Sequence, residues 1–296
     1  MRSGRLWMFW LAAAVLAGAF VFAGAGLDFG YVIPKRLVRL AAIAVGGVCV
    51  ALSAIVFQTL AGNRILTPAI LGYEAVYLLW QSLLLLLLGT EGLAALGVGG
   101  NFAVSIALML GYSWALQRWL LRSGANDVYL LLLLGLVLTM VIGTFTQFVQ
   151  LRISPGEFAV FQGLSHASFN RARPETLALS ALAVAAVCLA ALGVDHARQV
   201  RRHLALIAVL VAVSTSLIGP TAFLGIFVAH IAYALAGSSR HRATLPLGCA
   251  VAIAIFLAAQ LLVEHAFNYQ TTVSILVNLV CGAYFLALVV RGRGTA

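Results

Sequence analysis

Long apolar runs separated by short polar breaks dominate the sequence, and most of the charged residues lie in the breaks. A bilayer core of roughly 30 Å needs about 20 apolar residues for each helical crossing. Each apolar run is therefore interpreted as a membrane helix. The ten predicted segments are residues 7–26, 37–60, 70–89, 102–121, 128–149, 176–193, 203–218, 222–236, 245–263 and 273–290. This pattern predicts an all-α polytopic membrane protein with about ten transmembrane helices, forming a single domain over residues 1–296.

Proline positions support these segments, because proline inside a helix removes a hydrogen bond and clashes with the preceding turn. All six prolines, at positions 34, 68, 155, 174, 220 and 246, fall between the predicted segments or at their edges. The segment 222–236 spans only about 22 Å at 1.5 Å per residue, so it cannot cross the hydrocarbon without help. Because Gly219-Pro220 precedes it, we predict a helix break at membrane depth, covered by protein or by a watery cavity.

Small residues recur along the segment 37–60. They are Ala42, Gly46, Ala51 and Ala54. Residues of this size permit close contact between membrane helices. We expect ordinary helix packing here and no binding site.

Composition agrees with a membrane protein, since 63% of the residues are hydrophobic, 9% are charged and the mean hydropathy is +1.08. The net charge of +10 does not indicate nucleic-acid binding, because no basic stretch is interleaved with exposed aromatic residues. The four cysteines lie singly in apolar segments, without the spacing of a zinc site or a disulfide framework. We expect no metal site and no cofactor.

The basic residues indicate the orientation of the chain. With a cytoplasmic N-terminus, twelve of the eighteen Lys and Arg residues fall in inner loops and six in outer loops. This bias favours two cytoplasmic termini and an even number of spans. Arg2 and Arg5 precede an apolar run that imitates a signal peptide, but its length and the spans that follow favour an uncleaved first helix.

The sequence offers little chemistry of its own. Its single lysine, Lys35, follows Pro34, so a phosphate-binding loop of the form G-x-x-x-x-G-K-[ST] is impossible and any ATP must be bound by another subunit. The eight acidic residues lie near segment ends or in loops, which argues against a proton relay. His230 lies in an apolar run and is either a structural histidine or a gating or ligand-binding residue. The run 163–166 (GLSH) holds a serine beside a histidine, but neighbouring residues do not face each other, which argues against an intramembrane hydrolase.

A polar stripe occupies the outer end of the segment 128–149. Thr146 and Gln150 are four residues apart and Gln147 lies beside them. Two interpretations remain open, namely hydrogen bonds between helices and a wide, weakly polar pathway for a bulky solute.

Two motifs resemble a known family. Residues 63–72 (NRILTPAILG), preceded by Phe57-Gln58, are similar to the pattern N-P-L-A-x-P-x-x-L-G, and residues 219–232 (GPTAFLGIFVAHIA) are similar to G-P-I-x-F-V-G-L-x-x-P-H-x-x-R. These patterns mark the FecCD family, the permeases of iron–siderophore and vitamin B12 ABC importers. The residues that carry the resemblance are Asn63, Pro68, Gly72, Gly219, Pro220, Gly225 and His230. Residues 63–68 and 158–170 further resemble the second permease of petrobactin- and anguibactin-type systems.

The resemblance implies a BtuC-like fold, that of a type II ABC importer permease, in a bacterial cytoplasmic membrane. It implies a second permease subunit, identical or different, two cytoplasmic ATPase subunits, an external binding protein and a ferric siderophore as cargo. It also implies that basic residues on the outer face meet acidic residues of the binding protein. These residues are Lys35, Arg36, Arg152, Arg171 and Arg173.

Three departures from the family pattern stand out. Ala229 replaces the proline before the histidine, and Tyr233 replaces the arginine that ends the second motif. The cytoplasmic coupling segment of the form L-G-E-x-A-x-x-L-G is shortened to residues 193–203. Either it is a solvated inner loop or, as we prefer, a shortened helix that docks on the ATPase. The coupling residues are then Asp195, Arg198, Arg201 and Arg202.

The sequence thus favours a transport subunit without enzymatic activity. Vitamin B12 or haem is the alternative cargo, and an ion-coupled secondary transporter is the alternative mechanism.

Overall fold

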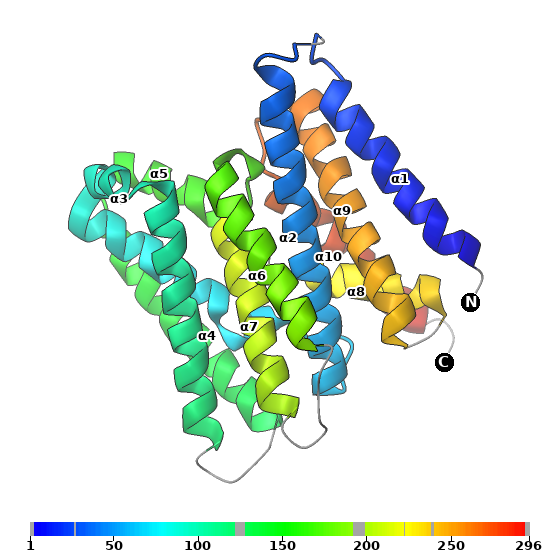
Figure 1. Cartoon of the computed structure of the whole chain (residues 1–296). Coiled ribbons are helices and arrows are strands. Elements are labelled where there is room, and N and C mark those ends of the chain that lie inside the picture. Colours follow the sequence, from blue (N-terminus) through cyan, green and yellow to red (C-terminus); the bar gives the residue numbers. More distant parts are fainter. Residues whose placement is uncertain are drawn as a thin grey trace.

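The computed structural model describes residues 3–26, 28–121, 128–191, 199–221, 223–237 and 240–293, and this part of the chain is helical, with no strand (Figure 1). The helices are α1 (Ser3–Phe22), α2 (Val32–Ala61), α3 (Tyr73–Leu121), α4 (Val128–Gln150), α5 (Pro155–Ser165), α6 (Pro174–Ala191), α7 (Gln199–Ile218), α8 (Leu224–Ala236), α9 (His241–His265) and α10 (Val273–Arg293). Two 3₁₀ turns, η1 (Pro68–Leu71) and η2 (Phe169–Arg171), lie between them. The all-α prediction is confirmed.

α3 consists of two helical halves, because the positive φ angles of Gly89 (64°) and Gly97 (66°) interrupt it. Its halves account for the predicted segments 70–89 and 102–121, so a described helix covers most of each of the ten predicted segments. α5 was not predicted. The proline argument was too strict, since Pro34 lies in the first turn of α2 and Pro246 lies inside α9.

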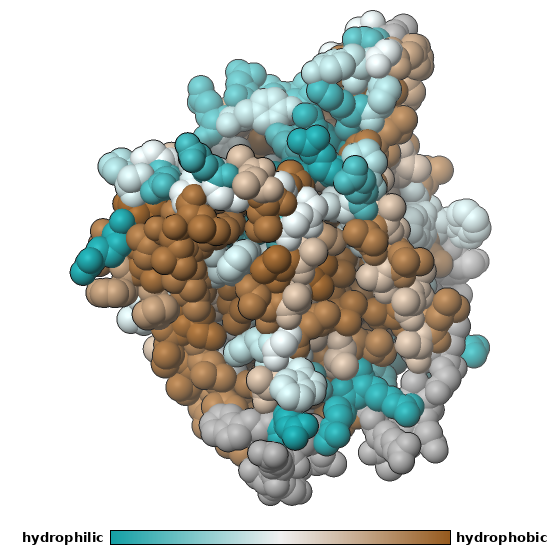
Figure 2. All heavy atoms as spheres, turned by 60° about the vertical axis from the view of Figure 1, so that its left-hand side comes forward, coloured by the Kyte–Doolittle hydropathy of each residue, from teal (hydrophilic) through white to brown (hydrophobic). Residues whose placement is uncertain are grey.

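Five stretches are long and apolar enough to cross a membrane. They are Val32–Ala61, Tyr73–Arg118, Leu130–Gln150, Val200–Ile218 and His241–His265. Shorter apolar helices accompany them, including the 13-residue α8. A broad hydrophobic band covers the middle of the face in Figure 2, with hydrophilic residues gathered above and below it. The chain is a multi-pass membrane protein.

α2 is the central helix of the fold and contacts α1, α6, α7, α8 and α9 (Figure 1). Its small residues allow close approach, as predicted. A Cβ on Gly46 would lie 2.8 Å from the Ile218 side chain of α7, and one on Gly47 would lie 3.1 Å from the Ile253 side chain of α9. Since lipid tails are as apolar as the side chains, such close packing, and not a hydrophobic effect, drives helix association here.

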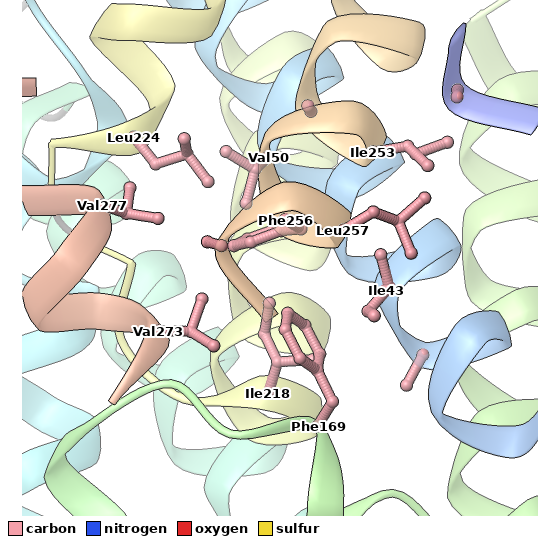
Figure 3. Packing of buried hydrophobic residues seen from close by; sticks show 14 of the residues in the cluster. Ile43, Val50, Phe169, Ile218, Leu224, Ile253, Phe256, Leu257, Val273 and Val277 are labelled. Atoms are coloured by element: carbon pink, nitrogen blue, oxygen red, sulfur yellow. The ribbon is translucent and has the colours of Figure 1, made fainter. Parts of the chain in front are cut away.

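The two largest apolar clusters among the described residues lie on either side of α2. The larger one joins α1, α2, α8, α9 and α10, and includes Phe169 of η2, whose ring packs edge-on to Phe256 with centroids 5.2 Å apart (Figure 3). The other joins α2, α3, α4 and α7 around Phe57 and Ile207. Through these two clusters, helices from the N-terminal and the C-terminal half of the chain pack against α2.

A buried polar network joins the two halves of α3. The Gln81 amide exchanges hydrogen bonds with Asn101, and its nitrogen also donates to Ser105 Oγ at 3.2 Å. Trp80 Nε1 donates to Asn101 Oδ1 at 2.9 Å. Hydrogen bonds of this kind hold membrane helices together.

Candidate translocation site

The predicted break between α7 and α8 is present, and charged side chains from two other elements hold its ends. Gly219 has a φ of 99°, a left-handed conformation that favours glycine. Arg171 Nη2 donates to Ile218 O at 3.1 Å, and Glu74 Oε1 accepts from the Thr221 N–H at 3.0 Å. A cation thus meets the carbonyl end of α7 and an anion meets the amide end of α8, as helix dipoles prefer.

The two sequence motifs meet at this break. A Cβ on Gly225 would lie 3.0 Å from Ala54 Cβ and 3.4 Å from Thr67 Cγ2, so α8 lies directly on α2 and on the turn before η1. Between them is a cavity of about 30 Å³, whose lining includes Ser53 and Glu74. This volume is enough for a water molecule.

Asn63, Pro68 and Gly72 of the first motif determine the turns between α2 and α3. Asn63 Oδ1 accepts from the Ile65 N–H at 3.0 Å, and Pro68 begins η1. Gly72, with a φ of 87°, ends η1, and a Cβ there would lie 2.8 Å from Tyr112 Oη. Both the φ angle and the close approach require glycine at this position.

A hollow of about 770 Å³ lies at the C-terminal end of α4 and the start of α5. Its lining residues are Thr144, Gln147, Phe148, Gln150, Leu151, Ile153, Pro155 and Phe158. The Phe148 ring stacks on Phe145 with centroids 6.4 Å apart, and the Arg152 guanidinium lies 5.9 Å from the Phe148 centroid. Amides, aromatic rings and a nearby cation therefore surround the opening.

The structure separates the three residues of the predicted polar stripe. Gln147 and Gln150 line the hollow, whereas Thr146 is buried and its hydroxyl donates to Ile142 O at 2.8 Å. Thr144 takes its place in the lining. Helix geometry accounts for the exchange of the two threonines, because Thr144 and Thr146 lie about 200° apart around α4, so Thr144 faces the opening when Thr146 faces the protein interior.

Comparisons with known proteins identify the family. The model of the FecCD transport family matches residues 19–192 and 189–291. The chain belongs to the FecCD transport family. It is 31% identical to the petrobactin import system permease protein YclO of Bacillus subtilis (strain 168), over 94% of each chain. It is 30% identical to the petrobactin import system permease protein FatC of Bacillus anthracis, over 88% of this chain and 79% of that protein.

Further similarities agree with this assignment. The ferric enterobactin transport system permease protein FepG of Escherichia coli (strain K12) is 25% identical over 86% of this chain and 81% of that protein. A solved structure described as a metal-chelate type ABC transporter in an inward-facing conformation has the same fold. It matches with a TM-score of 0.81 at 20% identity, over 97% of this chain and 98% of that chain.

In this FecCD member, three of the five basic residues expected at the docking surface are exposed, namely Lys35, Arg152 and Arg173. Lys35 lies over the Tyr31 ring, with Nζ 3.7 Å from the centroid, and donates to its hydroxyl. This hydrogen bond and the positive charge of Lys35 lower the pKa of Tyr31. The ammonium group thus stays exposed at the start of α2.

Arg36 does not belong to that surface. It is buried, donates to Phe20 O at 2.7 Å and Ala23 O at 2.6 Å, and forms an ion pair with Glu264. The guanidinium thus binds the last carbonyls of α1 and the acid at the end of α9. Arg36 cannot reach a docking protein and instead joins three helices.

Arg171 is also directed inward. Its guanidinium donates to Leu164 O at 3.3 Å, His166 O at 2.8 Å and Ile218 O at 3.1 Å. These carbonyls end α5 and α7. Arg171 therefore positions the helix break.

The residues expected to couple to an ATPase are only partly described. Arg201 and Arg202 are exposed in the first turn of α7. Asp195 and Arg198 lie outside the described residues.

His230 lies among aromatic rings. Its centroid is 5.8 Å from that of Tyr284 and 6.4 Å from that of Phe285, both on α10 and both edge-on. These contacts favour the structural interpretation of His230, as a packing residue between α8 and α10.

The Ser165–His166 pair does not form a catalytic arrangement. Both side chains donate to the Gln162 carbonyl, the Ser165 hydroxyl at 2.9 Å and His166 Nδ1 at 2.8 Å. Ser165 Oγ also lies 3.1 Å from His166 Nδ1, but a ring nitrogen that donates to the Gln162 carbonyl cannot at the same time accept the Ser165 proton.

Sequence reasoning missed Glu74, the acid that holds the start of α8. One signal for it was present, because Glu74 lies two residues after the first motif and Thr221 belongs to the second. The contact itself depends on the three-dimensional meeting of the motifs.

Proposed function

We propose that this protein is the permease subunit of an ATP-binding-cassette importer that carries ferric siderophore complexes across a bacterial cytoplasmic membrane. The observation that carries the proposal is the FecCD match over nearly the whole chain, together with two petrobactin permeases that are 30% and 31% identical. The hollow at the outer end of α4 supports it. Its rings and amides suit a large, partly aromatic and polar solute. Its lining residues carry no charge, which allows such a solute to be released again.

The energy for transport comes from separate subunits in this proposal. Lys35, the only lysine, lies exposed at the start of α2, behind Pro34, where no phosphate-binding loop exists. Two cytoplasmic ATPase subunits bind the inner face, where Arg201 and Arg202 are exposed, and both chain termini are cytoplasmic. An external binding protein delivers the cargo at Lys35, Arg152 and Arg173. A second permease, identical or different, completes the pathway.

Reconstitution tests the proposal. The permease, its partner permease, the ATPase and the binding protein are placed in proteoliposomes, and uptake of ⁵⁵Fe-labelled catecholate siderophores is compared with uptake of cobalamin and haem. We expect ATP-dependent iron uptake that requires every component. Preferential uptake of cobalamin or haem would show that one of these is the cargo and not a siderophore. Uptake by the permease alone, driven by an ion gradient, would show that the protein is a secondary transporter.

A further inference from the structure

Gln58, on α2, is a buried amide without a hydrogen-bond partner. Its side chain is 2% exposed, and neither Nε2 nor Oε1 forms a hydrogen bond within the part of the chain that the structure describes. Both atoms also have almost no accessible surface, even toward internal cavities, so no water molecule fits beside them. An unpaired buried amide destabilises the conformation that contains it. Its presence in a folded protein therefore needs a reason.

Gln81, on α3, shows how the chain satisfies a group of the same kind. It is fully buried, and its amide exchanges hydrogen bonds with Asn101 and donates to Ser105 Oγ at 3.2 Å. Both glutamines lie in apolar helices, but only Gln81 has polar neighbours that pair with it. Gln81 is therefore the reference with which Gln58 can be compared.

Gln58 lies on the face of α2 that packs against α8. Ala54 and Ile55 precede Gln58 by four and three residues, so the three side chains share one face of the helix. A Cβ on Gly225 of α8 would lie 3.0 Å from Ala54 Cβ, and Ile55 belongs to one apolar cluster with Ala229 of α8. The two helices lie side by side in Figure 1. Their close packing accounts for the exclusion of water from the amide.

α8 follows α2 past Gln58. Gly225, near the start of α8, meets Ala54 of α2. Tyr233, near the end of α8, has its ring centroid 4.8 Å from the guanidinium of Arg64, in the turn after α2. Gln58 lies between these two contacts along the chain. A movement of α8 away from α2 would therefore open a space at the amide.

The break before α8 is anchored by hydrogen bonds from several elements. In addition to the charged side chains described above, the Ser168 N–H donates to Ile218 O at 2.7 Å. Ser274 Oγ donates to Pro220 O at 3.3 Å. Gly219, between the two anchored carbonyls, has a φ of 99°. A short helix that is fixed at one end and joined there through a glycine can pivot about that end.

We propose that α8 pivots away from α2 during the transport cycle and that Gln58 keeps the packed position from becoming too stable to leave. When α8 lies against α2, the amide is unpaired, as in the structure. When α8 moves away, water enters and forms the missing hydrogen bonds. The amide thus lowers the free-energy difference between the two positions, so that both are populated. This inference rests on the proposed function, because it assigns the movement to transport.

The first test compares the same substitution at the two buried glutamines. Gln58→Met keeps the length of the side chain and removes its polar atoms, so it should raise the melting temperature in nanodiscs by about 2–4 °C. Gln81→Met leaves Asn101 and Ser105 without this partner and should lower the melting temperature. In reconstituted complexes, Gln58→Met should reduce ATP-dependent uptake about fivefold, because α8 then leaves α2 less often.

The second test measures the movement directly. Gln58→Cys, in a Cys188→Ser background because Cys188 is exposed, is treated with a small water-soluble thiol reagent at rest and during ATP turnover. We expect labelling during turnover only. Cys188→Ser alone is the control and should stay unlabelled, because the remaining cysteines are buried. They are Cys49, Cys249 and Cys281.

The outcomes separate this inference from the proposed function. An unchanged or lower melting temperature for Gln58→Met would show that the amide is not an unfavourable group and would overturn the inference. Wild-type uptake by Gln58→Met, or equal labelling of Gln58→Cys at rest and during turnover, would also overturn it while the proposed function stands. If the wild-type complex transports no siderophore, both fail.

Discussion

The carboxylate of Glu74 accepts a hydrogen bond from the backbone N–H of Thr221 at 3.0 Å. Glu74 lies in the first turn of α3, two residues after the first motif. Thr221 belongs to the second motif and lies three residues before α8 begins. Arg171 holds the other side of the break at Ile218 O. The two motifs therefore meet at one interrupted helix, although they lie far apart in the sequence.

Replacing Glu74 should destabilise this support. Glu74→Ala leaves a partly buried amide of the break unpaired, which costs about 1–3 kcal/mol. Glu74→Gln retains an acceptor oxygen and should cost less. Thermal unfolding in detergent measures both, and Glu91→Ala, at an exposed acid of α3, is the control and should change little. Equal melting temperatures for Glu74→Ala and Glu91→Ala would contradict the role assigned to Glu74.

Arg36 and Lys35 are neighbours in sequence with opposite expected effects. Arg36→Ala leaves Glu264 with an unpaired charge, and breaking a buried ion pair in this way costs about 3–5 kcal/mol. Lys35→Ala should leave stability nearly unchanged, because Lys35 is exposed. The comparison uses unfolding midpoints together with binding-protein affinity. A stable Arg36→Ala variant with impaired docking would return Arg36 to the outer surface.

Charge reversal at the exposed outer cations should weaken docking. For Lys35→Glu, Arg152→Glu and Arg173→Glu combined, we expect the affinity for the binding protein at low salt to fall at least tenfold, since like charges then face each other. Raising the ionic strength should reduce the difference between wild type and variant. Arg202→Glu, at the inner end, is the matched control. An unchanged affinity at low salt would refute the docking surface.

Gly219 should not tolerate a side chain. A Cβ there would lie 2.6 Å from Arg171 Nη2 and 2.7 Å from His166 O, in a backbone conformation with a φ of 99°. Gly219→Ala is therefore expected to lower the melting temperature and to abolish transport, because the break must shift. Gly111→Ala, in α3 with nothing within 4 Å of the added Cβ, should be neutral or stabilising by up to about 1 kcal/mol. If the two variants behave alike, the strain at the break is not structurally important.

Hydropathy was sufficient to predict the helices because lipid requires every crossing segment to satisfy its own backbone hydrogen bonds. The short α8 and the break before it were also readable, since Gly219-Pro220 interrupts an otherwise apolar run. α5 was missed because it is only 11 residues long and is bounded by polar residues. Its start was nevertheless encoded, as Ser154 and Glu157 form a capping box.

The site was harder to predict because the direction of a side chain depends on its neighbours. Arg36 and Lys35 are both basic and adjacent, yet only the carbonyls of α1 and the acid on α9 draw Arg36 inward. Similarly, Thr144 and Thr146 are both threonines near one helix end, and a rotation of about 200° separates them. The sequence predicted that this end of α4 is polar. Packing against neighbouring helices determines which of its residues line the hollow.

The ion pair between Arg36 and Glu264 also bears on how the protein is made. The two residues are 228 positions apart, so at about 5–20 residues per second the acid is synthesised roughly 11–46 s after the arginine. Until then the guanidinium at the top of α2 is paired only with the carbonyls of α1. Glu264, the ion-pair partner of Arg36 in the folded protein, is therefore absent until α9 has been synthesised. A chain truncated before α9 lacks the residue that neutralises Arg36.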